Sequence, residues 1–197
     1  PTTTTSLRSP RLNLNDPKRI IDTLLRNLVQ KKTLTPEDLD TVLNITMRKV
    51  ADVVYAQAVS VFMFDKATQR IRFRNVYYSP TLYGLDGAKK KAFEAKAKEL
   101  ESVTLGLDQG IVGKVIRTGE PVFLADVRED ANFSGAVDQS TGFVTQSMIA
   151  VPLKNGLVTF GCIQVLNKAP SNKQVVPFEE AERQKIIKTG ELTVEVK

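Results

Sequence analysis

Three polar side chains recur at helical spacing in the segment VDQSTGFVTQS: Asp138, Thr141 and Thr145. If this segment is helical, all three project from one face, with Asp138 near the start of the helix. A helix start offers unpaired backbone N–H groups and a favourable dipole to an anion, and hydroxyl groups orient what is bound. The pattern therefore predicts a binding pocket for a compact anionic ligand.

Composition limits the chemistry further, because the chain contains no histidine and a single cysteine, Cys162. Histidine-dependent catalytic triads, haem or iron bound through histidine, and a structural zinc site are thereby excluded. Cys162 lies in the apolar segment FGCIQVL, which predicts a buried core thiol and not a reactive one. We expect no catalytic residue, no metal site and no cofactor.

Hydrophobic periodicity indicates the elements that position these residues. Strands are predicted within residues 59–77, 103–107, 121–125 and 147–167, with turns at 66–69 and at Asn155–Gly156. Helices are predicted within residues 17–32, 35–54 and 111–118, and residues 79–101 are expected to form an exposed helical insertion. This succession predicts an α/β (α+β) fold, with a central antiparallel sheet of about five or six strands and helices on its faces.

Positive charge is concentrated at the N-terminal end of the chain. Residues 1–32 hold seven basic and two acidic side chains, a net of +5, so the other 165 residues supply only +1 of the total of +6. This arm lacks the interleaved aromatic residues of a single-strand-binding platform, so we expect no nucleic-acid partner. Without an apolar run of about 18 residues or an apolar N-terminal signal, we expect no membrane insertion and a cytoplasmic location.

The stretch from Leu105 to Lys168 resembles a GAF domain, in particular the cyclic-nucleotide-binding GAF domains upstream of phosphodiesterase and adenylate cyclase catalytic domains. The resemblance spans roughly residues 34–182 and implies a ligand, cyclic GMP or cyclic AMP. Its ligand-binding positions fall on Ser60, Ile111, Val112, Ser134, Asp138, Thr141, Thr145 and Gln164. Gln164 stands where some members place an acid that reads guanine. Because an amide both donates and accepts hydrogen bonds, the choice between the two purines stays open.

A second motif of these domains follows the last central strand. It runs from an asparagine–lysine pair through a spacer to a phenylalanine, three further residues and an aspartate–glutamate pair. In this chain it falls on Asn167, Lys168, Phe178, Glu182 and Arg183, so the final pair departs from the pattern. The resemblance implies a structural latch in which Lys168 pairs with Glu182, or with the glutamate at 179 or 180, while Phe178 anchors the last helix.

Two other roles of GAF-fold proteins do not fit these residues. Reduction of free methionine sulfoxide needs cysteines that form a catalytic disulfide, and bilin attachment pairs a loop cysteine with a histidine. The chain offers only Cys162 and no histidine. Replacing Thr145 with valine is expected to weaken nucleotide binding while changing the stability of the ligand-free domain little.

Together these features predict a non-catalytic regulatory sensor domain. Residues 1–33 are expected to form an N-terminal extension with a helix, 34–189 the GAF domain with its insertion at 79–101, and 190–197 a C-terminal tail. The domain would bind a cyclic purine nucleotide, relay ligand state to an output domain of the same polypeptide, such as a phosphodiesterase or cyclase, and form a homodimer through its N-terminal helices. The alternative is a GAF dimerisation or interaction module with no nucleotide ligand.

Overall fold

The computed structural model describes residues 36–170 and 174–190, and the helix expected over residues 17–32 lies outside this range. The chain separates into two compact units, residues 1–45 and 46–197, and the sheet belongs wholly to the second. No helix in the described part is long and apolar enough to cross a lipid bilayer.

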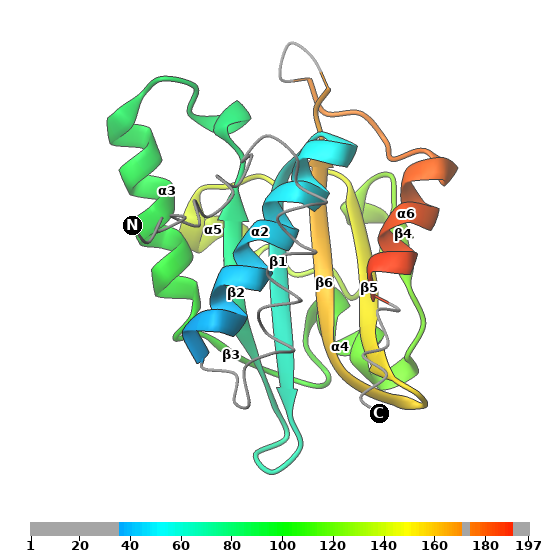
Figure 1. The fold of residues 1–197 in the computed structure, drawn as a ribbon. Coiled ribbons are helices and arrows are strands. Elements are labelled where there is room, and N and C mark those ends of the chain that lie inside the picture. The colour runs from blue at the N-terminus through cyan, green and yellow to red at the C-terminus, as the bar shows by residue number, and fades with distance from the viewer. Residues whose placement is uncertain (1–35, 171–173, 191–197) are drawn as a thin grey trace, which may run out of the picture. The chain divides into compact units, whose positions relative to one another are not determined.

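A curled antiparallel sheet, six-stranded within the described residues, forms the centre of the second unit (Figure 1). Its strands are β1 (Ala56–Asp65), β2 (Arg70–Tyr78), β3 (Thr104–Gly106), β4 (Val122–Leu124), β5 (Met148–Asn155) and β6 (Val158–Lys168). They lie in the order β3-β2-β1-β6-β5-β4, so β1 and β6 pair at the centre although most of the unit's sequence separates them. The predicted antiparallel sheet with helices on its faces is confirmed.

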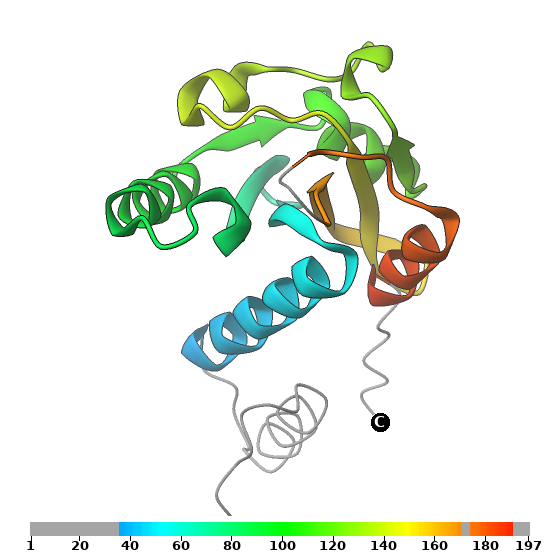
Figure 2. The ribbon, with the colours of Figure 1, turned by 90° about the horizontal axis from the view of Figure 1, so that it is seen from above.

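Helices cover both faces of this sheet. They are α2 (Pro36–Val54), of which residues 46–54 belong to the second unit, α3 (Gly87–Leu100), α4 (Gly110–Thr118), α5 (Ala136–Thr141) and α6 (Glu180–Gly190). Figure 2 shows the end of α2 and helix α6 on one face, with α4 and α5 on the other. Helix α3 lies beside β2, and α4 packs on β5 and β6.

Strand register divides the side chains of the three central strands into two contrasting faces. One face, called here the aliphatic face, carries the rows Val59–Val165–Ile149 and Val61–Ile163–Val151, taken in the order β1, β6, β5. The other, called here the mixed face, carries the rows Ser60–Gln164–Ala150 and Ala58–Leu166–Met148. Because side chains alternate along a strand, the polar row lies one residue away from the aliphatic rows.

The segment VDQSTGFVTQS is not helical throughout, which corrects the prediction. Helix α5 ends at Thr141 because Gly142 adopts a left-handed conformation with φ of 68°, and its N–H bonds to the Asp138 carbonyl. Left-handed glycine terminates helices readily since it has no Cβ to clash. Residues 143–147 then continue without helical structure into β5. Asp138 and Thr145 therefore do not share a helix face.

Candidate functional site

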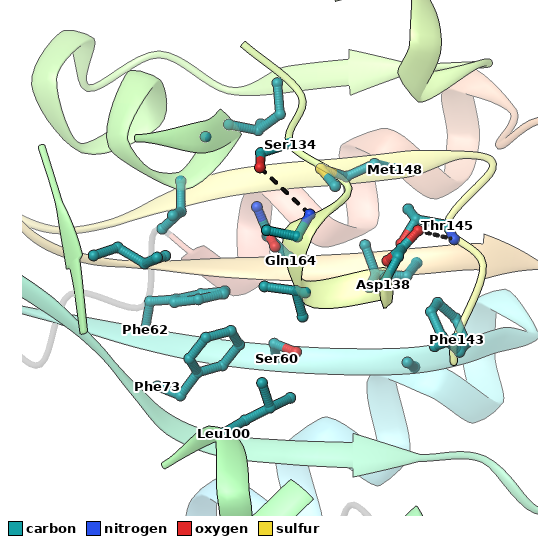
Figure 3. Close-up of a pocket in the computed structure, with 18 of the residues that line it drawn as sticks. Ser60, Phe62, Phe73, Leu100, Ser134, Asp138, Phe143, Thr145, Met148 and Gln164 are labelled. Carbon is teal, nitrogen blue, oxygen red and sulfur yellow. Dashed lines mark hydrogen bonds between the residues drawn. The ribbon is translucent and has the colours of Figure 1, made fainter. Parts of the chain in front are cut away.

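A cavity of about 180 Å³ lies between the mixed face and the helices α4 and α5 (Figure 3). Of the eight residues predicted to bind ligand, seven line it: Ser60, Ile111, Val112, Ser134, Asp138, Thr145 and Gln164. They come from β1, β6, α4 and the segment between β4 and β5. The fold thus brings together residues that are far apart in the sequence; their binding of a ligand stays a prediction.

The polar floor of the cavity comes from Ser60 and Gln164, which are directly paired across β1 and β6. Both side chains are more than nine-tenths buried, at 5% and 8% exposure. Neither makes a side-chain hydrogen bond to another described residue, and both face the cavity, although buried polar groups normally have a partner. Ala150, the other neighbour of Gln164 in its row, has too short a side chain to cover the amide. The amide therefore has its donor and its acceptor available to a bound molecule.

The start of α4 forms one end of the cavity, where Gly110, Ile111 and Val112 are lining residues. Gln109, the residue at the N-cap position, makes no capping hydrogen bond to this helix. Its Oε1 instead accepts from the Gly106 N–H at 2.6 Å. The N–H groups of the first turn of a helix have no partner within the helix. Together with the helix dipole they favour an anion at this end of the cavity.

Asp138 and Thr145 bond to each other above the cavity. The Thr145 backbone N–H donates to Asp138 Oδ2 and its hydroxyl donates to Asp138 Oδ1, both at 2.7 Å. These two hydrogen bonds connect α5 to the segment that follows it. Residues 136–147, which include α5 and this segment, are called the cover below. The contact also alters the expectation for Thr145→Val, since valine would remove a hydrogen bond of the ligand-free protein.

Thr141, the eighth predicted residue, is buried but does not line the cavity. Its hydroxyl donates to the Val137 carbonyl at 2.9 Å and accepts from the Phe143 N–H at 3.2 Å. These bonds hold the C-terminal turn of α5 and the residue after Gly142. The hydroxyl is thus bonded to the backbone of the cover in this structure, and its role as a direct ligand contact stays a prediction.

An aromatic wall borders the cavity beside these residues. Tyr78 packs against Phe143 with ring centroids 5.8 Å apart, and both line the cavity together with Phe62, Phe73 and Phe133. Burial raises the pKa of Tyr78 to about 12; the Asp138 carboxylate adds to the rise and a hydrogen bond with Thr141 opposes it. The phenol is therefore neutral at physiological pH.

The segment that carries Phe133 and Ser134 is held to α4 by an ion pair. Lys114 Nζ lies 2.7 Å from Asp130 Oδ2, and Asp130 also accepts from the backbone and side chain of Asn132. The hydrogen bond from Lys114, followed by those from Asn132, lowers the pKa of Asp130 to about 2. The Ser134 hydroxyl accepts from the Ala136 N–H at 3.4 Å, a long bond at the start of α5.

Outside the cavity, the second motif forms a partly buried polar cluster at the end of β6. Lys168 Nζ lies 2.8 Å from Glu182 Oε2 and 3.1 Å from Glu179 Oε1, so the predicted pair forms and Glu179 joins it. Burial lowers the pKa of Lys168, but bonds to Glu182 and Glu179 outweigh this and raise it overall. Phe178 is buried, with 4% exposure, immediately before α6.

Asn167 has a different role from its neighbour in this motif. It is 1% exposed and has a φ of 56°, a left-handed conformation that asparagine tolerates better than most residues. Its Oδ1 accepts from the N–H groups of Gln146 and Ser147, and its Nδ2 donates to Val144 O and Gln57 Oε1. Asn167 therefore anchors the C-terminal end of the cover to β6 and β1.

The cavity has no basic side chain among its lining residues, and Asp138 is its one acid. No group of three potential metal ligands occurs among residues 36–170 and 174–190. Cys162 is buried in β6, and burial raises the pKa of its thiol. The arrangement provides hydrogen bonds, aromatic contact and a helix start, which are binding groups and not an acid–base pair.

Comparison with known sequences supports a specific family. The sequence model of the GAF domain matches residues 38–188. A "Probable 3',5'-cyclic phosphodiesterase pde-5" from Caenorhabditis elegans is 23% identical over 130 residues, covering 66% of this chain and 17% of that protein. The mouse "Cone cGMP-specific 3',5'-cyclic phosphodiesterase subunit alpha'" is 35% identical over 66 residues, covering 34% of this chain and 8% of that protein. The chain thus spans a small part of these relatives.

Solved structures share the fold at low sequence identity. The GAF domain of an Acinetobacter phosphoenolpyruvate-protein phosphotransferase aligns with a TM-score of 0.57 and 22% identity, covering 87% of this chain and 89% of that one. The type II free methionine-R-sulfoxide reductase of Thermoplasma acidophilum aligns with a TM-score of 0.57 and 13% identity, covering 80% and 90%. The same fold therefore occurs in a GAF domain of a phosphotransferase protein and in a reductase, so the fold leaves the function open.

Proposed function

The chain belongs to the GAF domain family, and on that basis we propose that it is a non-catalytic regulatory sensor that binds a cyclic purine nucleotide, cyclic GMP or cyclic AMP. The observation that carries the proposal is the mostly buried pair Ser60 and Gln164, which faces the cavity without a side-chain bond to another described residue, opposite the uncapped start of α4. A polar group buried without a partner costs stability. Its presence in a cavity is explained if a ligand supplies the missing bonds.

The chemistry of the cavity supports a purine and a singly charged phosphate. Gln164 offers one donor and one acceptor, which match the amide edge of guanine as well as the N1 and amino groups of adenine. Aromatic side chains such as Phe133 and Phe143 provide apolar contact for a planar base. The first turn of α4 would receive the cyclic phosphate through backbone N–H groups and the helix dipole, without a lysine or arginine.

The size of the cavity adds a requirement to this proposal. About 180 Å³ is below the roughly 300 Å³ at which pockets for drug-sized ligands begin. A cyclic nucleotide would therefore bind only if part of the wall moves outward. Binding would then change the position of the cover, and such a displacement is the kind of signal a sensor domain transmits.

Several partners follow from this proposal. An output domain of the same polypeptide, such as a phosphodiesterase or cyclase, would receive the signal, in keeping with the two phosphodiesterase relatives. A homodimer through the N-terminal helices remains a proposal, because residues 1–35 lie outside the described structure. The fold shared with a methionine sulfoxide reductase does not extend to that chemistry here, since the sequence holds one cysteine and no histidine.

Isothermal titration calorimetry with cyclic GMP and cyclic AMP tests the proposal directly. We expect wild-type protein to bind at least one of them, and Gln164→Leu to bind it about 10-fold or more weakly, because a base edge would lose both hydrogen bonds. Ligand-free Gln164→Leu should be at least as stable as wild type in urea unfolding, since the amide has no protein partner. Leucine has a side-chain volume similar to that of glutamine. Unfolding of the ligand-free variant therefore shows whether a loss of binding comes from misfolding.

Each outcome of this titration decides a separate point. Absence of binding heat and of a thermal shift with either nucleotide at millimolar concentration would contradict the sensor proposal and favour an interaction module. Unchanged affinity in Gln164→Leu would leave nucleotide binding in place but remove Gln164 from the contact. A preference for one nucleotide that vanishes in the variant would identify Gln164 as the residue that reads the base.

A further inference from the structure

Helix α3 presents one inward stripe, formed by Phe93, Lys96, Ala97 and Leu100, at spacings of three and four residues. Phe93 packs on Tyr78 with ring centroids 4.8 Å apart, and Leu100 is 4% exposed. Lys96 is the charged member of this otherwise apolar stripe, and it is partly buried. Most other residues of the helix are exposed, so a lysine on the inward side needs an explanation.

The Lys96 ammonium crosses to the cover. Its Nζ donates a hydrogen bond to the Thr141 carbonyl, the last of α5. A Cβ placed on Gly142 would lie 3.4 Å from the same Nζ, so the lysine also sits against the residue that ends the helix. A cation at this end is favoured by the helix dipole, and a terminal carbonyl lacks a partner within the helix.

Helix α5 needs support of this kind because it has six residues. Isolated helices of such length do not persist in water. Apart from the bond between Tyr78 and Thr141, its other polar contacts arise within residues 134–147: Asp138 to Thr145, Thr141 to Val137 and Phe143, and Ser134 to Ala136. Lys96 supplies the polar contact to α5 from α3, a separate element that lies beside β2.

We propose that Lys96 is a positioning residue that fastens the cover over the cavity, and so controls access of the ligand. The part of this inference that concerns access rests on the proposed function, whereas the fastening itself does not. When the hydrogen bond from Lys96 breaks, the C-terminal turn of α5 loses its polar contact with α3. The cavity wall that bears Asp138, Phe143 and Thr145 then moves away from the sheet. Because the cavity of about 180 Å³ is smaller than a nucleotide requires, this opening must accompany nucleotide binding.

Hydrogen exchange of the ligand-free protein tests the fastening without reference to any nucleotide. In Lys96→Met we expect exchange of amides in residues 136–147 to accelerate about 5- to 10-fold, because a charge-assisted hydrogen bond at a partly exposed site is lost. Exchange in β5 and β6 should stay unchanged. Lys96→Arg should recover most of the protection, and Lys91→Met, on the exposed side of α3, should match wild type.

Stopped-flow binding of fluorescent cyclic GMP or cyclic AMP analogues then tests access. Lys96→Met should raise the dissociation rate constant about 5-fold or more, with an association rate constant equal to or above that of wild type. Unchanged exchange in the cover, or an equal change in Lys91→Met, would overturn the fastening. Accelerated exchange throughout the sheet would mean general destabilisation and would also overturn it. If wild type binds neither nucleotide, the proposed function fails while the exchange result still decides the role of Lys96.

Discussion

The two faces of one sheet are built in different ways, although their residues alternate along the same strands. On the aliphatic face, Val59, Val165 and Ile149 are each 0% exposed and form a continuous row across β1, β6 and β5. On the mixed face, the adjacent row holds Ser60 and Gln164 and borders a cavity. The first face is closely packed with aliphatic side chains, whereas the second also carries a buried core cluster under α4 but leaves a cavity beside its polar row. Both faces therefore contribute to the core, and the mixed face is in addition suited to binding.

The largest difference between the two faces is expected when two adjacent side chains of β5, one on each face, are replaced with alanine. Ile149→Ala should lower the free energy of unfolding by about 2–5 kcal/mol, since it opens a void in a closely packed row. Met148→Ala, one residue earlier and facing the cavity, should cost about 1 kcal/mol less, because part of its surroundings is already empty. Urea unfolding of both variants gives the difference. An equal or larger cost for Met148→Ala would mean that the two faces are packed alike.

A smaller effect is expected for the ion pair that holds the segment with Phe133 and Ser134 to α4, above the mixed face. Asp130→Asn should lower the free energy of unfolding by about 1–2 kcal/mol at pH 7, a value reduced for the partial exposure of Lys114. The pKa of Asp130 is lowered to about 2 in the folded state, so its contribution is present above about pH 4 and is lost as pH falls towards 2.

The pH dependence is the control for this prediction. Unfolding of wild type and Asp130→Asn should be compared between pH 7 and pH 2, where the difference in stability should shrink towards zero. The loss caused by Ile149→Ala should vary little over the same range, because no titrating group is removed. A constant difference between wild type and Asp130→Asn at all pH values would contradict the assignment to the ion pair with Lys114.

The smallest effect is expected in the cover. Thr145→Val should lower stability by about 0.5–1.5 kcal/mol, since Asp138 loses one of its two donors but remains partly accessible to water. Differential scanning calorimetry of the ligand-free protein measures it. A melting temperature identical to that of wild type would show that the hydroxyl contributes nothing in the absence of ligand, as the sequence alone led us to expect.

The sequence predicted local elements well where a local cause determined them. The α4 helix ends where Gly119 takes a left-handed conformation, as its position after the apolar run indicated. The alternation in β1 placed Ser60 on the face opposite Val59 and Val61. Local spacing failed in the cover, where the 3- and 4-residue intervals of Asp138, Thr141 and Thr145 suggested one helix. Gly142 was the signal that this helix ends at Thr141.

Contacts between distant segments could not be read from spacing. The pairing of Ser60 with Gln164 depends on the register of β1 against β6, which many other contacts set together. The resemblance to a GAF domain supplied this pairing indirectly, by naming both positions as ligand contacts. Lys96 was missed because its partner is the backbone carbonyl of Thr141. Every residue has such a carbonyl, so the sequence does not indicate which one a lysine contacts. A lysine on the apolar stripe of α3 was the available clue.

The burial of Cys162 makes this domain convenient for site-specific labelling. Its thiol is fully buried in β6, and its raised pKa leaves little thiolate to react with maleimides in the folded protein. Because the chain has no other cysteine, a single cysteine introduced on the surface becomes the sole reactive site without any background substitution. A fluorophore attached at Lys91→Cys on α3 or at Gln139→Cys on α5, both exposed positions, would report motion of the corresponding helix in real time.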